Sequence, residues 1–294
     1  MNKIFIVGSI NTDFVISAPY MPKGGETLVG GGFFTARGGK GANQAVAAKR
    51  LGGDVKMCGC VGDDLFGAEA LKAFEKEGIA VLHVRTVAGV PTGTAVIVVT
   101  NGENRIVIDK GANGCLTKAD VDDFLVDANE GDVFLTQLEN PLDVIGYALQ
   151  KAKEKGLFTI LNPAPANVEI RPYLQYCDLI TPNETEWETL GGKQGVFIKE
   201  DANVIVTLGE KGYEILSKNN EKVYPCRQVQ VVDTTAAGDT FCGGLATRLT
   251  KGDTLEEAAA FACKAATLAC TKKGAQSSIP TKEEIEDCEE ELSL

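Results

Sequence analysis

Short apolar segments alternate with helical segments through the second half of the chain, and this alternation constrains the fold more than any other feature. Strands are predicted at 133–138 and 158–162, with a helix between them from Pro141 to Gly156. Further strands are predicted over three segments: 178–183, 203–209 and 213–217. Strands that alternate with helices form a mostly parallel sheet with helices on both faces. We therefore expect an α/β fold, a three-layer sandwich in which helices flank a central, mostly parallel sheet.

The N-terminal part adds a strand and two helices to this scheme. Residues 3–8 are apolar and predict a buried strand, and residues 42–51 predict a helix. A second helix is predicted over 64–77, with one buried stripe of four residues: Leu65, Ala68, Leu71 and Phe74. The last helix is predicted after Pro280, with a capping box formed by Thr281 and Glu284. A chain of 294 residues suits one large domain, so we expect residues 1–294 to form a single unit.

Residues 94–109 differ from the helix–strand units around them. TAVIVVT and RIVID are predicted strands, and Asn101-Gly102 between them is a typical hairpin turn. Residues 26–35 are also extended and rich in glycine. We expect these segments to form a small separate sheet that acts as a lid.

Charge and cysteine content exclude several classes of protein. A formal net charge of −12 disfavours general nucleic-acid binding. No stretch reaches the ~18 apolar residues of a membrane span, and the N-terminus shows no signal-peptide pattern. The nine cysteines are scattered, and the pair Cys58 and Cys60 lacks a neighbouring histidine, so it is a poor zinc motif. We expect a cytoplasmic protein with reduced thiols and with neither nucleic-acid nor membrane partners.

The stretch VVDTTAAGDTFCGG, residues 231–244, places a carboxylate at the start of a predicted helix. The small residues at 236–238 allow a ligand to approach the backbone, and the N–H groups of a helix start bind anions. Asp239 would then lie where a phosphate also lies. Alternatively, Asp239 is a simple N-cap that stabilises its helix by ~1 kcal/mol. The local residues leave both interpretations open.

A glycine-rich stretch, GGKGAN at 38–43, opens another predicted helix. The chain contains no Walker A pattern, and its G-x-G pairs at 30/32 and 39/41 lack the third glycine of a dinucleotide fingerprint. The stretch is therefore either a tight loop with a solvated lysine or a place where backbone and polar side chains approach a small polar ligand.

Two polar clusters directly follow predicted strands. Asn183 and Glu186 lie three residues apart and could hold a hydrated magnesium ion near phosphates, or form an ordinary capped helix start. Asn11 and Asp13 could bond adjacent sugar hydroxyls, or serve as turn residues. Because ligands of open α/β sheets bind at the carboxyl ends of strands, both clusters are candidate site residues.

Along the chain, GGKGAN lies near the front, NETE (183–186) in the middle and DTTAAGD (233–239) late. In this order and taken together, the motifs resemble the ribokinase branch of the ribokinase-like (PfkB) carbohydrate kinases. The similarity extends over nearly the whole chain and includes three more stretches: NPAPA at 162–166, TLG at 207–209 and KGAQ at 273–276. The resemblance implies a single ribokinase-like domain with a lid formed by segments at about 14–36 and 92–110. It also implies that the lid closes over the sugar, excludes water and forms a homodimer contact.

The activity implied by the resemblance is ATP-dependent phosphorylation of D-ribose at O5 to give D-ribose 5-phosphate. In such a kinase Asp239 takes the proton from the O5 hydroxyl, and the backbone N–H groups of Ala236, Ala237 and Gly238 bind the transferring γ-phosphoryl group. Phosphoryl transfer mainly requires alignment and charge stabilisation, which these groups supply.

The same resemblance implies a set of binding residues and cofactors. The sugar-binding positions are Asn11, Asp13, Gly39, Lys40, Asn43 and Glu139. The nucleotide-binding positions are Asn183 and Glu186, which match the Mg·ATP motif, with Thr207, Gly209 and Gly212. The positions of the monovalent-cation loops are Asp233, Thr235, Ala269, Lys272, Gly274 and Ser278. We therefore expect Mg²⁺ with ATP, and K⁺ or a similar monovalent cation.

One departure from the family pattern lies between residues 187 and 206, where the chain is short and such kinases usually have a helix. A short crossover between parallel strands requires either a reduced helix or a neighbouring segment that covers the gap.

Two other functions remain open from the sequence. The chain could be a kinase for a related sugar or nucleoside, such as deoxyribose, fructose or pseudouridine, or a non-catalytic sugar or nucleotide sensor. The intact Asp239 argues against a sensor, because binding alone does not require that base. Asp13 can span two neighbouring hydroxyls, which favours ribose over 2-deoxyribose.

Overall fold

The first strand, β1 (Ile4–Val7), is buried on both faces and is an inner strand of the large sheet. Ile4 and Ile6 pack into one hydrophobic cluster, whereas Phe5 and Val7 pack into a second cluster on the opposite face. Successive side chains of a strand point to opposite faces, so a continuous apolar run requires a layer on each side. The predicted three-layer α/β sandwich is confirmed.

The computed structural model describes residues 2–101, 103–196, 203–217 and 220–293. Over these residues the large sheet has nine strands in the order β13-β12-β11-β10-β9-β8-β1-β4-β5. The strands that accompany β1 are β4 (Val55–Gly62), β5 (Ala80–Val87), β8 (Val133–Thr136), β9 (Phe158–Leu161), β10 (Leu179–Ile180), β11 (Asn203–Thr207), β12 (Tyr213–Ser217) and β13 (Asn220–Tyr224). Pairing is parallel from β5 to β11 and antiparallel for β12 and β13 at one edge.

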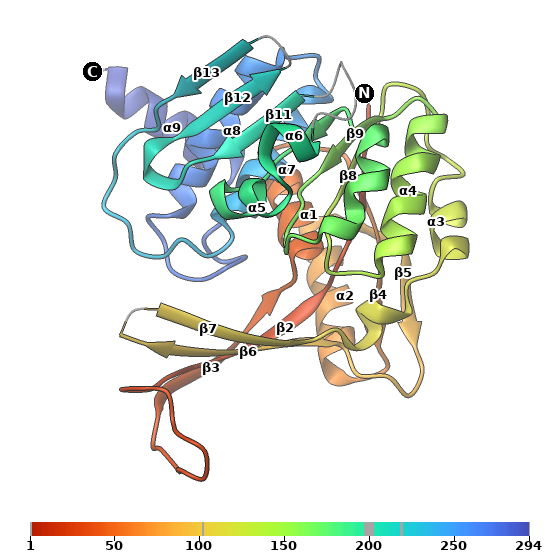
Figure 1. The fold of residues 1–294 in the computed structure, drawn as a ribbon. Helices are drawn as coiled ribbons and strands as arrows, with labels where there is room; N and C mark the ends of the chain where they lie inside the picture. Colours follow the sequence, from red (N-terminus) through yellow and green to blue (C-terminus); the bar gives the residue numbers. More distant parts are fainter. Residues whose placement is uncertain (1, 102, 197–202, 218–219, 294) are drawn as a thin grey trace.

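Helices cover both faces of the sheet (Figure 1). One face carries α1 (Lys40–Arg50), α2 (Leu65–Glu77), α7 (Ala237–Leu249) and α8 (Leu255–Ala269). The other face carries α3 (Lys118–Phe124), α4 (Leu142–Glu154) and the 3₁₀ segment η2 (Val168–Tyr176). The last helix, α9 (Lys282–Ser293), packs on α8 through Ile285 and begins with the predicted capping box of Thr281 and Glu284.

A second sheet projects away from the sandwich, as Figure 1 shows at its lower end. Its four strands, in the order β3-β2-β6-β7, are β2 (Asn11–Ser17), β3 (Gly31–Gly38), β6 (Gly93–Thr100) and β7 (Glu103–Asp109). The predicted hairpin is present: β6 pairs antiparallel with β7, and Asn101 adopts a positive φ of 52° at the turn. A small separate sheet is thus confirmed, and its action as a lid stays a prediction.

Two local details differ from expectation or refine it. The predicted apolar stripe of α2 is only partly right: Phe74 is buried and Leu71 packs against the core, but Leu65 is 68% exposed and Ala68 is exposed. Gly67 and Ala70 are buried in their place. The crossover between β10 and β11 contains two short helices, α5 (Glu184–Thr189) and α6 (Gly192–Val196). The first of the two possibilities, a reduced helix, therefore holds over the described part of this connection, and residues 197–202 lie outside it.

A search of the described residues for a helix long and apolar enough to cross a membrane finds none.

Candidate active site

The carboxyl ends of the parallel strands and the start of α7 enclose a cleft of about 380 Å³. Residues after β9, β10 and β11 form one wall, and the start of α7 with Lys40 of α1 forms the other. The residues that line it are Lys40, Asn162, Ala164, Thr181, Asn183, Glu184, Thr185, Glu186, Thr207, Gly209, Thr234, Ala236, Gly238, Asp239 and Cys242. Segments far apart in the sequence thus meet where ligands of open α/β sheets bind.

Asp239 is the third residue of α7 and is only 7% exposed. Its carboxylate accepts two hydrogen bonds from α1: Asn43 Nδ2 donates to Oδ2 over 2.9 Å, and Gln44 Nε2 donates to Oδ1 over 3.0 Å. The N-cap position belongs to Ala236, which makes no side-chain capping bond. The interpretation of Asp239 as a simple N-cap is therefore wrong, because its side chain is aimed at α1 and the cleft.

The backbone just before Asp239 has an unusual shape. Ala236 adopts a left-handed conformation with φ 61°, which is uncommon for a residue with a side chain and indicates a locally enforced geometry. A methyl group added to Gly238 would meet no atom within 4 Å, so this residue faces open space. Of the three N–H groups expected to bind a phosphoryl group, that of Ala237 donates to Thr234 O over 3.2 Å.

Acidic side chains gather around Lys40 and around Asp13. Glu139 accepts hydrogen bonds from the Ser9 hydroxyl and from the Lys40 backbone N–H. Burial, together with the nearby charges of Glu139 and Asp239, raises the pKa of Asp13 to about 6. Burial disfavours the charged form of Lys40, but the surrounding carboxylates, Asp239 first, outweigh it and raise the pKa of the lysine. Lys40 thus stays cationic among acidic side chains.

Close backbone contacts bring the first strand and the glycine-rich loop together. Gly39 has φ 89°, and a Cβ there would lie 2.7 Å from Asn11 N, so the loop requires glycine at this position. A Cβ on Gly38 would lie 2.3 Å from the Asp13 carboxylate oxygens. Asn11 is held from the other side by Asn113, whose Nδ2 donates to Asn11 Oδ1 over 2.7 Å. The predicted sugar-binding residues are thereby brought to one place.

Asn183 and Glu186 form the capped helix start that the sequence offered as one interpretation, and their role at a magnesium ion stays a prediction. They form a capping box at the start of α5: Asn183 Oδ1 accepts from Glu186 N, and Glu186 Oε2 accepts from Asn183 N. Both residues also line the cleft. Burial raises the pKa of Glu186, although its bond from the Asn183 backbone opposes this. The capping box thus fixes a carboxylate at the cleft wall.

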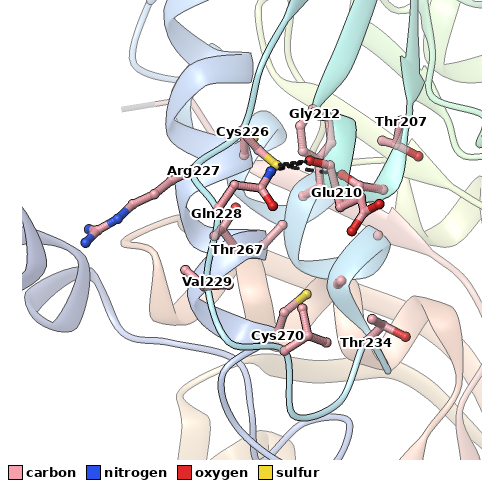
Figure 2. A pocket seen from close by; sticks show the side chains of 17 residues that line it. Thr207, Glu210, Gly212, Cys226, Arg227, Gln228, Val229, Thr234, Thr267 and Cys270 are labelled. Carbon is pink, nitrogen blue, oxygen red and sulfur yellow. Dashed lines mark hydrogen bonds between the residues drawn. The ribbon is translucent and has the colours of Figure 1, made fainter.

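A larger cavity of about 530 Å³ adjoins the cleft and is drawn in Figure 2. Thr207, Gly209 and Gly212, the remaining predicted nucleotide-binding residues, line it, and Thr207, Gly209, Thr234 and Gly238 line both spaces. Much of the wall is apolar or sulfur-containing, from Val229, Val231, Phe241, Cys226, Cys263 and Cys270. Figure 2 shows that the Arg227 side chain points away from this cavity. A mostly apolar cavity that opens onto a polar cleft suits a flat ring attached to a charged tail.

Apart from Ala269, the predicted cation residues lie on two loops, and hydrogen bonds to Asp233 join these loops. Its carboxylate accepts from Thr235 N and Oγ1 over 2.9 and 2.6 Å, and from Gly274 N over 2.9 Å. Burial opposes ionisation of Asp233, but these hydrogen bonds prevail and lower its pKa. Lys272 directs its ammonium to Glu284 on α9, at 2.5 Å, and Ser278 bonds to Ala275 O. Ala269, the last residue of α8, accepts the Lys272 backbone N–H.

Residues 1–282 match the pfkB family of carbohydrate kinases. The chain belongs to this family. It is therefore a sugar kinase that transfers a phosphoryl group to an alcohol.

The relatives and solved structures that resemble this PfkB kinase include ribokinases and a deoxyribokinase. The chain is 44% identical to a ribokinase of Haemophilus influenzae, over 95% of each chain. It superimposes on the ribokinase of Thermotoga maritima with a TM-score of 0.85 at 38% identity, covering 99% of this chain and 100% of that one. It superimposes on an Arabidopsis thaliana ribokinase complexed with ribose and ATP with a TM-score of 0.84 at 30% identity, covering 98% of each chain. A deoxyribokinase of Salmonella typhi is 38% identical over 99% of each chain.

Several residues of this PfkB kinase site were not predicted from the sequence. Gln44, Asn162 and Asn113 are buried and hydrogen-bonded to predicted site residues or to one another. Each is an amide inside an otherwise apolar or glycine-rich run, and a buried polar residue needs partners. A polar residue directly after an apolar strand, such as Asn162, was the available signal.

Proposed function

We propose that this kinase phosphorylates D-ribose at O5 with ATP and releases D-ribose 5-phosphate. The observation that carries the proposal is the position of Asp239: a buried carboxylate at the start of α7, held by Asn43, in the wall of a cleft that shares Gly238 with the larger cavity. The similarity to ribokinases, including one complexed with ribose and ATP, supports ribose as the sugar.

Asp239 is proposed as the base for the O5 hydroxyl. A carboxylate is a weak base toward an alcohol, so its function is to orient the hydroxyl and to accept its proton as the new P–O bond forms. The N–H groups of Ala236, Ala237 and Gly238 would stabilise the charge of the γ-phosphoryl oxygens. The 3.2 Å bond from Ala237 N to Thr234 O would have to be exchanged for a bond to the phosphoryl group.

The sugar is proposed to lie between β2 and the start of α1. Asp13 would accept from two neighbouring hydroxyls, and Asn11, Gly39, Lys40 and Glu139 would complete the contacts. Asn43 Oδ1 is buried and has no hydrogen-bond partner within the described chain, so it is available to accept from a sugar hydroxyl. A 2-deoxy sugar would leave part of this buried polar set unpaired, which favours ribose over 2-deoxyribose.

ATP is proposed to place its base in the larger cavity, near Thr207, Gly209 and Gly212, and its phosphates in the cleft. Asn183 and Glu186 fit a hydrated Mg²⁺ bound to the phosphates, because an anionic oxygen at the cleft wall is a suitable partner for the ion's water ligands. When bound, Mg²⁺ neutralises phosphate charge. Asp239 would position the sugar hydroxyl, and the N–H groups at the start of α7 would position the γ-phosphoryl group.

K⁺ or a similar cation is proposed to bind between the loops that carry Asp233, Thr235, Ala269, Lys272, Gly274 and Ser278. The low pKa of Asp233 keeps a negative charge at the junction of the two loops, which fits a cation. Such an ion would order the loop that leads into the start of α7 without touching the sugar.

The small sheet, with its segments at about 14–36 and 92–110, is proposed to close over the sugar and to form a homodimer. Large apolar side chains exposed on this sheet support an intersubunit contact: Phe33, Val96, Ile106, Val107 and Ile108. A cytoplasmic location is retained as a proposal, supported by the free thiols of the cysteines within the described ranges.

The test is a coupled assay of the purified protein with ATP and a panel of ribose, 2-deoxyribose, fructose and pseudouridine. We expect the highest kcat/KM for ribose, with the phosphate on O5. Preferred turnover of another substrate would contradict the proposal.

A further inference from the structure

Gln44 is the second residue that holds Asp239, and it lies behind the carboxylate. Its side chain is fully buried, and its Nε2 donates to Asp239 Oδ1 over 3.0 Å. The described residues that line the two cavities include Asp239 but not Gln44. Gln44 therefore reaches the reacting groups only through Asp239.

The orientation of the Gln44 amide is fixed by its other partners. Asn162 Nδ2 donates to the backbone oxygen of Thr181 over 2.8 Å, and because a carbonyl can only accept, Asn162 must turn its Oδ1 toward Gln44. That Oδ1 accepts from Gln44 Nε2 over 3.1 Å. On the other side, Gln137 Nε2 donates to Gln44 Oε1 over 2.6 Å. Both Nε2 protons of Gln44 are thus used, one by Asn162 and one by Asp239.

These partners come from three adjacent strands. Gln137, Asn162 and Thr181 are the first residues after β8, β9 and β10, which are neighbours in the sheet. A Cβ on Gly8 would lie 2.3 Å from Gln137 Oε1, so the glycine leaves room for this amide. The edge of the sheet therefore sets the position of Gln44, and Gln44 sets the position of the Asp239 carboxylate.

We propose that Gln44 is a positioning residue for phosphoryl transfer, which fixes the Asp239 carboxylate so that its remaining lone pairs face the sugar hydroxyl. This inference rests on the proposed function, in which Asp239 is the base. Asn43 holds Oδ2 and Gln44 holds Oδ1 from adjacent positions of one helix, so the two amides together define the plane of the carboxylate. The last torsion of an aspartate is otherwise broad, and a misplaced base lowers the rate more than it lowers affinity.

The test compares four variants by steady-state kinetics, ribose binding by calorimetry and thermal unfolding. Gln44→Met removes the amide but nearly keeps its volume, and Asp239→Asn is measured in parallel. Thr247→Val is the matched control, because Thr247 is buried and also joins α7 to α1, through Ala48 O at 3.0 Å, but does not contact Asp239. For Gln44→Met we expect kcat to fall by ~30-fold to ~100-fold with the ribose Kd changed by less than ~3-fold. Thr247→Val should lose stability but keep kcat.

The fourth variant, Gln44→Glu, is measured by the pH dependence of kcat, which a change in packing alone would not alter. Its new carboxyl group can donate to Asp239 only while it holds a proton, so we expect kcat to recover at acidic pH and to fall as pH rises. The Gln44 amide of the parent enzyme does not titrate, so the parent should lack this fall. The other charged or titratable groups that face Asp239 come from β2, α1, α5 and α7: Asp13, Lys40, Glu186 and Cys242. They are unchanged in every variant compared, so they do not account for a fall in kcat that only Gln44→Glu shows.

Two results would overturn the inference: a folded Gln44→Met enzyme with kcat within ~3-fold of the parent, or a Gln44→Glu pH profile parallel to the parent's. If Gln44→Met does not fold, the Gln44→Glu profile decides alone. An active Asp239→Asn enzyme would instead reject the base assignment of the proposed function. An inactive Asp239→Asn enzyme beside a normal Gln44→Met enzyme would reject only the inference about Gln44.

Discussion

Asn113 Nδ2 donates to Asn11 Oδ1 over 2.7 Å, and this bond fixes which end of the Asn11 amide faces the proposed sugar site. Asn113 is itself oriented by the backbone of Ile10, whose N–H donates to Asn113 Oδ1 over 2.8 Å and whose carbonyl accepts from Nδ2. Asn11 therefore has its own Nδ2, a donor, free to face the proposed sugar site.

Replacing Asn113 by aspartate tests this orientation. The Asn113→Asp side chain still accepts from Ile10 N, but it offers oxygen to Asn11, so the Asn11 amide should rotate and present its acceptor to the sugar. We expect the KM for ribose to rise by ~10-fold, with a smaller change in kcat, because a buried polar pair is mismatched. Steady-state kinetics measures this. Asn167→Asp, which keeps a helix cap remote from the sugar residues, is the control. An unchanged KM would show that Asn11 does not contact the sugar.

The raised pKa of Asp13 links the proposed sugar site to the pH dependence of stability. Its pKa is raised from 3.8 to about 6, so its contribution to stability is fully present below pH 3.8 and is lost as pH rises through about 6. The ionised group is destabilising at pH 8, by up to about 3 kcal/mol. Asp13→Asn should therefore raise the free energy of unfolding at pH 8, with a gain that shrinks toward pH 4, while activity with ribose falls by ~100-fold.

Denaturant unfolding at pH 4, 6 and 8 checks the Asp13 prediction. Asp109→Asn, on the exposed strand β7, serves as control and should show no such pH-dependent gain. A gain for Asp13→Asn that is equal at all three pH values would contradict the buried-carboxylate explanation.

Much of the fold and several cleft residues could be predicted from the sequence, for a physical reason. The strands β1, β8, β9 and β11 are short apolar runs that a sheet buried on both faces requires, and glycine-rich turns mark where chain and ligand approach closely. The cleft residues Asn183, Glu186 and Asp239 were predicted because each follows a strand or opens a helix.

Other features of the fold and of the site could not be predicted from the local sequence pattern. Strand β4 contains Cys58, Gly59 and Cys60, and β5 has an exposed, alternating face, so neither has the β-branched run that predicts a buried strand. The start of the α2 stripe was misplaced because Leu65, an apolar residue, faces solvent at 68% exposure, whereas Leu71 and Phe74 lie on the core side as predicted. Gln44 and Asn113 gain their significance only from partners that are distant in the sequence, at Asp239 and Asn11, which no local pattern reveals.

Gly238 lies between the cleft and the larger cavity, where an added methyl group meets no protein atom. Gly238→Ala should therefore leave stability unchanged or slightly increased, by up to about 1 kcal/mol for a helical position. The methyl group would occupy the proposed phosphate path, so kcat/KM for ATP should fall by ~10-fold or more. Thermal unfolding and kinetics at saturating ribose measure both. Gly24→Ala, also in open space, is the control. An unchanged kcat/KM for ATP in Gly238→Ala would show that the phosphates do not lie next to Gly238.

Asp233 supplies the charge at the junction of the two proposed cation loops. Asp233→Asn can still accept from Gly274 N, but it loses the negative charge, so activation by KCl over the same concentration of tetramethylammonium chloride should disappear. Asp253 pairs with Arg248 in the last turn of α7 and lines neither cavity, so Asp253→Asn should retain whatever activation the parent enzyme shows. Equal potassium activation in the Asp233 and Asp253 variants would remove Asp233 from the cation site.

The most direct test of the account is the turnover of Asp239→Asn with ribose and ATP. The substitution keeps the size of the side chain and removes the proton acceptor. We predict that kcat falls by about 100-fold to 10,000-fold, while the calorimetric Kd for ribose changes by less than ~3-fold. A folded Asp239→Asn enzyme that turns over ribose at near the parent rate would contradict the assignment of Asp239 as the base.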